Sequence, residues 1–223
     1  MHVEVPKSHS FKEFAGEYVM IVVSIITALA LENGVHRYHQ NHRAHEASRN
    51  IEAELTANLT DLRSVIKQND AQLAKTTQMR DILLAGIEAR APDKDAIENA
   101  IKKAGGQFGI VMVTPSFQHE AWDVAVANQS LTWVETDRLK QYATQYSGMR
   151  DVQTVLANRG TSFVDHTQVA AAFASLKLKE YNARDTYRVL TQISATHDAT
   201  NSLLKELERA LTQAQQKTAK LAH

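Results

Sequence analysis

The most informative part of this sequence is residues 11–45, FKEFAGEYVMIVVSIITALALENGVHRYHQNHRAH. The stretch opens with charged residues, is almost purely aliphatic over residues 18–31, and then becomes a polar run rich in histidine. Three interpretations fit such a pattern: a retained membrane span, a cleaved signal peptide, and the buried helix of a soluble protein. The length of the apolar run and its flanking residues distinguish between them.

Residues 18–31 carry no formal charge, and as a helix they would extend about 21 Å, which is less than the roughly 30 Å of a hydrocarbon core. Extension back to Phe14 gives about 27 Å and includes Glu17 near one edge. Eight Val, Ile and Leu residues favour insertion by about 2–5 kcal/mol in total, whereas an edge carboxylate costs less than the roughly 2.5 kcal/mol of a central one. We therefore expect residues 14–34 to form a single-pass transmembrane anchor behind a tail of residues 1–13.

The two other interpretations stay open. Ala28-Leu29-Ala30 matches the small-residue pattern of a signal-peptidase site, although the region before the apolar run is long and contains acidic residues. Fourteen apolar residues also suit a core helix. The orientation of an anchor is nearly balanced, with two lysines before the run and three arginines after it. A short tail followed by a large domain favours a bacterial inner-membrane protein whose C-terminal domain is periplasmic.

Glu17, Ser24 and Ala28 are separated by seven and four residues, so they share one face of a helix. Small residues allow close approach of a second helix within a bilayer, and a carboxyl group there needs a partner or a hydrated interface. These three residues are the predicted contact with a second copy or with a partner membrane protein. A Glu17 that merely lies among the lipid headgroups is the alternative.

The composition excludes several classes of function. Lys and Arg total 25, Asp and Glu total 25, and there is no Cys. A balanced charge gives no indication of nucleic-acid binding, and the lack of thiols excludes disulfides, thiolate metal sites and cysteine nucleophiles. Only 8 Gly and 3 Pro in 223 residues argue against a turn-rich β protein. We expect no cofactor.

Four histidines follow the anchor at intervals of three: His36, His39, His42 and His45. A step of three residues advances about 300° around a helix, so the four imidazoles spiral around the axis, and although neighbouring pairs could chelate a metal, the four together cannot form one site on a single helix. The pattern predicts a hydrated collar next to the membrane, which becomes cationic below about pH 6.5.

Near-heptad apolar spacing predicts a long helix over residues 35–92, with polar interruptions at Asn69 and Thr76 and termination near Gly86 and Pro92. Its apolar positions are Ile51, Leu55, Leu59, Leu62, Ile66, Leu73, Leu83 and Ile87. Residues 93–160 are expected to form a short-helix insertion, with Ser116 capping a helix. Residues 161–223 are expected to be C-terminal helices packed on the long helix. The predicted fold is all-α, an N-terminal transmembrane helix continuing into an antiparallel bundle or coiled coil.

The segments GE-aliphatic-ALALEN (residues 16–33), SRNIEAELTANLTDL and AWDVAVANQSLTWVETDRLKQYATQYSGM resemble an uncharacterised bacterial family of small membrane-anchored proteins. The likeness covers roughly residues 12–65 and 116–150. Members of that family carry a Trp just after the anchor, where this chain has Gly34. The resemblance implies a membrane location and a helical fold, and it supplies no catalytic residues.

Aromatic residues and acid–imidazole pairs are the remaining candidates. Trp122, Trp133, Tyr142 and Tyr146 could line a pocket or groove, although large aromatics are usually core residues. The pairs are His119 with Asp123, Asp165 with His166, and His197 with Asp198, and no nucleophile motif accompanies them. We therefore expect a non-catalytic membrane-anchored scaffold or accessory subunit that binds the lipid bilayer and is a homo-oligomer or joins a partner membrane protein. The alternative is a ligand-sensing helical bundle.

Overall fold

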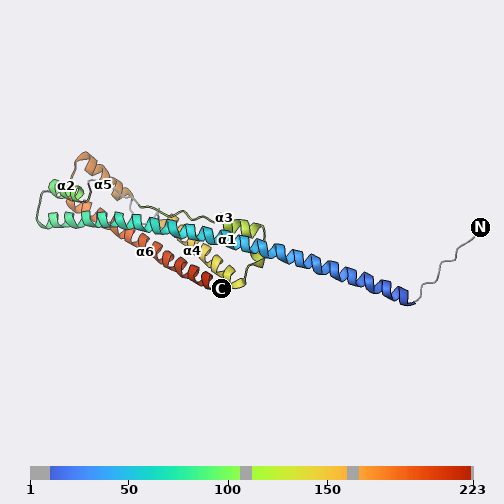
Figure 1. The fold of residues 1–223 in the computed structure, drawn as a ribbon. Helices are drawn as coiled ribbons and strands as arrows, with labels where there is room; N and C mark the ends of the chain where they lie inside the picture. The colour runs from blue at the N-terminus through green and yellow to red at the C-terminus, as the bar shows by residue number, and fades with distance from the viewer. Residues whose placement is uncertain (1–10, 106–111, 160–165, 222–223) are drawn as a thin grey trace, which may run out of the picture.

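The chain folds almost entirely into helices (Figure 1). The structure is a computed structural model that describes residues 11–105, 112–159 and 166–221, and the side chains of residues 15–105, 112–158 and 168–220. The elements in these ranges are α1 (Phe11–Glu88), α2 (Asp93–Lys103), α3 (Glu120–Ala127), the 3-10 helix η1 (Ser130–Trp133), α4 (Thr136–Arg159), α5 (His166–Leu178) and α6 (Ala183–Leu221). The predicted all-α class is confirmed.

Helix α1 is the axis of the molecule. Its 78 residues extend about 117 Å and continue without interruption through Asn33 and Gly34, so the predicted anchor and the predicted long helix are one element. The helix ends where Arg90 adopts a left-handed conformation with φ 54°. The amides of Arg90 and Ala91 then donate to the carbonyls of Ile87 and Gly86, which satisfies carbonyls of the last turn.

Helix α6 packs along α1 in the antiparallel direction, as predicted (Figure 1). Arg63 Nε donates to Glu208 Oε1 at 2.8 Å, whereas Asn201 and Lys205 both donate to Asp70. The partner numbers on α6 fall as the numbers on α1 rise, which defines the direction. The segment 161–223 differs in one respect from the prediction, because α5 packs on α6.

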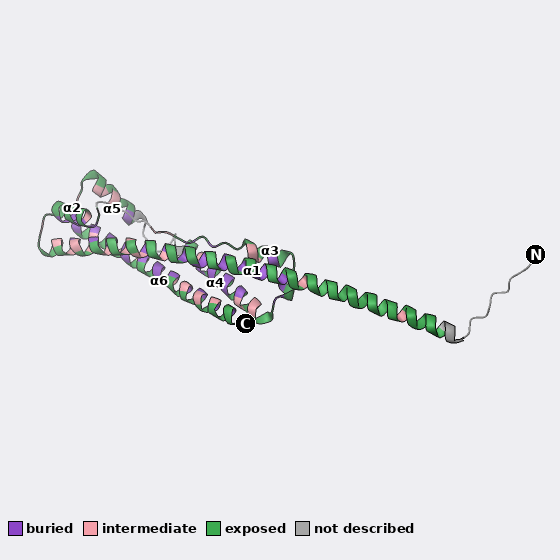
Figure 2. Ribbon diagram, viewed as in Figure 1, coloured by how far each residue is buried: buried purple, intermediate pink, exposed green. Residues whose placement is uncertain are grey.

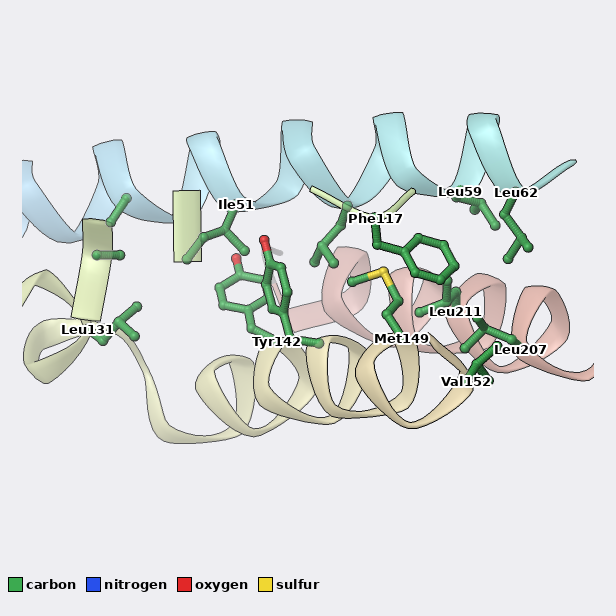
Figure 3. Packing of buried hydrophobic residues seen from close by; sticks show 14 of the residues in the cluster. Ile51, Leu59, Leu62, Phe117, Leu131, Tyr142, Met149, Val152, Leu207 and Leu211 are labelled. Carbon is green, nitrogen blue, oxygen red and sulfur yellow. The ribbon is translucent and has the colours of Figure 1, made fainter. Parts of the chain in front are cut away.

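The apolar residues of the bundle form two main clusters. The larger one joins α1, α3, η1, α4 and the C-terminal half of α6, and Figure 3 shows Ile51, Tyr142, Met149 and Leu207 meeting in it. The smaller one joins the end of α1 to α2 and the start of α6, where Gly86 lies so close to Ala96 that a Cβ would come within 2.9 Å of it. All eight predicted apolar positions of α1 are buried or half-buried.

Between the two clusters most of the buried side chains of α1 and α6 are polar. On α1 the stretch contains Asn69 and Thr76, which the sequence marked as interruptions of the apolar stripe. On α6 it contains Ser194, His197, Thr200 and Asn201, all less than 5% exposed. We call these six residues the polar layer. It divides the bundle into a part near the projecting helix and a part at the far end.

One local prediction is wrong. Helix α3 begins at Glu120 with His119 at its N-cap, so Ser116 does not cap it. The predicted C-terminal helices are α5 and α6, which are separated after Leu178, where Lys179 adopts φ 62°. Asn182 then caps α6, because its Oδ1 accepts the amide of Asp185 at 3.0 Å and its Nδ2 donates to the carboxylate of Asp185.

Candidate functional site

The N-terminal third of α1 projects from the bundle with no other part of the described chain against it (Figure 2). From residue 15 to residue 43 every side chain is exposed except Val22 and Gln40, which are half-buried. Its large apolar side chains are between 54% and 71% exposed. By length and composition, α1 is the one helix among the described residues that is apolar enough to cross a membrane.

Glu17, Ser24 and Ala28 all lie exposed on this projecting segment. The hydroxyl of Ser24 donates to the carbonyl of Met20 at 2.8 Å, and the hydroxyl of Thr27 donates to that of Val23 at the same distance. Both hydroxyl protons are therefore bonded within the helix, as an apolar environment requires. The three residues share one face of a continuous helix, so this face is available for a partner helix.

The four histidines follow the apolar segment on the same helix, and all are exposed. His42 and His45 border a shallow cavity of about 410 Å³ together with Arg49, Glu52 and Arg138. This cavity lies at the base of the projecting segment, where α1 meets the start of α4. No group of three or more potential metal-ligating side chains comes together within the described residues.

The four predicted aromatic residues do not share one pocket lining. Trp122 packs against Tyr146 with ring centroids 5.1 Å apart, and Tyr146 is a core residue only 4% exposed. Tyr142 is fully buried in the same apolar cluster, as Figure 3 shows. Trp133 is 50% exposed at the end of η1. The first three of these residues mainly stabilise the bundle.

Two carboxylates on α1 hold the tyrosines of α4. The hydroxyl of Tyr142 donates to Glu52 Oε1 at 2.5 Å, and that of Tyr146 donates to Glu54 Oε1. Burial raises the pKa of both phenols, and the hydrogen bonds to the carboxylates raise it further. Both tyrosines therefore stay protonated and act as hydrogen-bond donors that fix α4 to α1.

Glu54 also organises the connection between α2 and α3. Its Oε2 accepts the amide of Ala121 at 2.8 Å, which caps the start of α3 from a residue 67 positions away. Further along α1, Asn58 pairs with both backbone polar groups of Gln118, and Asn69 pairs with both of Val113. These side chains hold the non-helical residues 113–118 against α1 by hydrogen bonds, a role that no sequence motif indicated.

The acid–imidazole pairs have different surroundings. His119 Nδ1 and Asp123 Oδ2 are 2.7 Å apart, but both side chains are more than 60% exposed, so this is a hydrogen-bonded pair on the surface. Asp165 and the side chain of His166 lie outside the described residues. His197 is buried in the polar layer, and Asp198 next to it is exposed. Neither described pair is set beside a nucleophile in the way that a catalytic triad requires.

The sequence marked His197 only as a member of an acid–imidazole pair and did not indicate its burial. It is 3% exposed, and neither ring nitrogen has a hydrogen-bond partner among the described residues. Burial lowers the pKa of the imidazole, so the ring is neutral in the folded protein near pH 7. Ser194 Oγ and Asn201 Oδ1, on the same face of α6, also lack partners in the described part of the chain.

No family model, no curated protein and no solved structure was found to match this chain. The resemblance to the family of membrane-anchored proteins therefore stays a prediction.

Proposed function

We propose that the protein is a membrane-anchored scaffold or accessory subunit of a bacterial membrane assembly. The observation that carries the proposal is the projecting segment of α1, whose large apolar side chains over residues 18–38, except the half-buried Val22, are exposed and do not pack against the bundle. In water such a surface costs free energy in proportion to its area, about 25 cal/mol per Å². A bilayer removes that cost, and the length of the segment suits a single span.

The bundle beyond the segment supports a binding role. Its buried polar groups are engaged mainly in holding α1, α3, α4 and α6 together. Neither described acid–imidazole pair is placed beside a nucleophile. In the proposal, α1 places the bundle in the periplasm, and the face with Glu17, Ser24 and Ala28 contacts a second copy or a partner membrane protein.

The anchoring is tested by fractionation of cells that express the full chain. We expect the wild type in the membrane pellet after carbonate extraction, and a variant with Val23→Glu and Ile26→Lys in the supernatant. The matched control, Val155→Glu on exposed α4, should stay in the pellet. Intact wild-type protein in the supernatant would refute the anchor.

The orientation is tested with single cysteines, because the chain has none of its own. Gln213→Cys lies exposed on α6 and should react in intact cells with a membrane-impermeant maleimide. Ser10→Cys, before the apolar run, should react only after lysis. The reverse pattern would place the bundle in the cytoplasm.

A further inference from the structure

A cavity of about 290 Å³ lies between α1, α4 and α6, separate from the projecting segment. Its wall includes Glu52 from α1, Tyr142 and Gln145 from α4, and Gln215 from α6. Leu55 and Ala219 provide an apolar side. Glu52 is the one formally charged residue among the side chains that line the cavity.

Gln145 is the unusual member of this lining. It is 97% buried, since only 3% of its surface is exposed, and its Oε1 has no hydrogen-bond partner among the described residues. Its Nε2 is occupied, donating to the carbonyl of Gln141 at 3.2 Å. A buried amide oxygen without a donor costs about 1–3 kcal/mol, so a donor that enters the cavity would recover free energy here.

The other polar groups of the cavity also present acceptors. Glu52 Oε1 accepts the hydroxyl proton of Tyr142, and a carboxylate has acceptor sites on both oxygens, so Glu52 keeps acceptor capacity beyond this hydrogen bond. The hydroxyl proton of Thr218 is used by the carbonyl of Ala214 at 3.1 Å, which leaves the oxygen as an acceptor. The cavity therefore combines one negative charge with several unused acceptors.

We propose that this cavity binds a primary ammonium group on an aliphatic chain. The –NH₃⁺ group has three donors and one positive charge, which match the Glu52 carboxylate, Gln145 Oε1 and one further acceptor. The cavity is much larger than a bare ion, and Leu55 and Ala219 cover the methylene groups. The ligand is a free aliphatic amine or the lysine side chain of another protein molecule.

The test uses the purified full chain in nanodiscs, titrated with n-butylammonium and with 1,4-diaminobutane in a calorimeter. We expect saturable binding to the wild type, at least tenfold weaker binding to Glu52→Gln, and at least threefold weaker binding to Gln145→Met. Asp61→Asn is the matched control, because it removes the same charge from an exposed position nine residues along α1, on the opposite face. Thermal unfolding by circular dichroism verifies that each variant is folded.

The two sources of the amine give different results. If the natural ligand is a free amine, the titrated amine binds with the same affinity at low and high protein concentration. If the natural ligand is a lysine of a second protein molecule, that lysine competes at high protein concentration. The measured affinity is then lower at high protein concentration, and the titrated amine dissociates oligomers. Absence of saturable binding to the folded wild type overturns the proposal, as does equal binding to wild type and Glu52→Gln. Neither result bears on membrane anchoring, which carbonate extraction tests independently.

Discussion

At the scale of single residues, His197 is a buried imidazole in unfavourable surroundings. Its ring is buried and lacks hydrogen-bond partners in the described chain, and such a group costs about 1–3 kcal/mol of desolvation that nothing offsets. Because burial also lowers the pKa of the ring, the folded protein binds a proton at this site less readily than the unfolded chain does. The site therefore links the stability of the fold to pH.

The direction of this linkage follows from the lowered pKa. The unfolded imidazole takes up a proton near pH 6.5, whereas the folded one does so only at lower pH. The free energy of unfolding therefore decreases as the pH falls below about 6.5 toward the pKa of the folded state, because the unfolded chain takes up a proton that the folded protein does not.

We predict that His197→Leu has an unfolding free energy equal to or about 1 kcal/mol above that of the wild type at pH 7.5. Its loss of unfolding free energy between pH 7.5 and pH 5.5 should be smaller than that of the wild type. Urea unfolding at the two pH values measures both quantities. His42→Gln, at an exposed position, is the control, and identical pH dependence in all three proteins would contradict the prediction.

At the scale of elements, the two asparagines of α1 form a matched set of attachment points. Asn58 and Asn69 are eleven residues apart, which is about 16.5 Å along a helix and slightly more than three full turns. Their partners, Gln118 and Val113, are five residues apart, and five extended residues also span about 16.5 Å. The connecting segment is therefore held in register with α1 and runs antiparallel to it.

We predict that Asn58→Leu lowers the unfolding free energy by about 2–4 kcal/mol, because the backbone amide and carbonyl of Gln118 lose their partners together. Hydrogen exchange should become faster at the amide of Gln118. Asn50→Leu, at an exposed position eight residues earlier on α1, is the control and should change stability by less than about 0.5 kcal/mol. Equal effects of the two substitutions would show that the pairing is unimportant.

These elements also show how much of the fold was accessible from the sequence. The apolar stripe of α1 and the pattern of α6 have helical periodicity, so their burial and their pairing followed from local spacing. The cap of α3 is Glu54, which is 67 residues from Ala121, and no local pattern indicates so distant a partner. The break between α5 and α6 had a local signal, Asn182 followed by Asp185, which the apolar spacing around it obscured.

The candidate functional residues also fall into a part that followed from the sequence and a part that depends on how the helices pack. The exposure of Glu17, Ser24 and Ala28 agrees with their place in an apolar run, since the run finds no partner within the described chain. Of the predicted aromatic group, Trp122, Tyr142 and Tyr146 meet in the apolar core, whereas Trp133 is exposed at the end of η1. The cavity around Glu52 and Gln145 joins three helices, so it depends on their packing and has no motif.

At the scale of the whole molecule, one face of α1 is proposed to contact a second copy in the membrane. We predict that Ser24→Cys forms disulfide-linked dimers in oxidised membranes at several times the yield of Ile26→Cys. The two positions lie about 160° apart around the helix. Non-reducing gels measure the yields, and the native chain has no cysteine to interfere. Equal yields would contradict the pairing of two copies on this face.

The continuity of α1 has a mechanical consequence. The helix that would lie in the bilayer is the same helix on which α2, α3 and α6 pack, and no loop separates the two parts. From Gly34 to Glu88 it extends about 81 Å, so a change of about 10° in the tilt of the membrane segment would displace the far end by about 14 Å. In the proposed arrangement, the protein is a lever that converts small reorientations within the bilayer into large lateral movements of α2 and its surroundings.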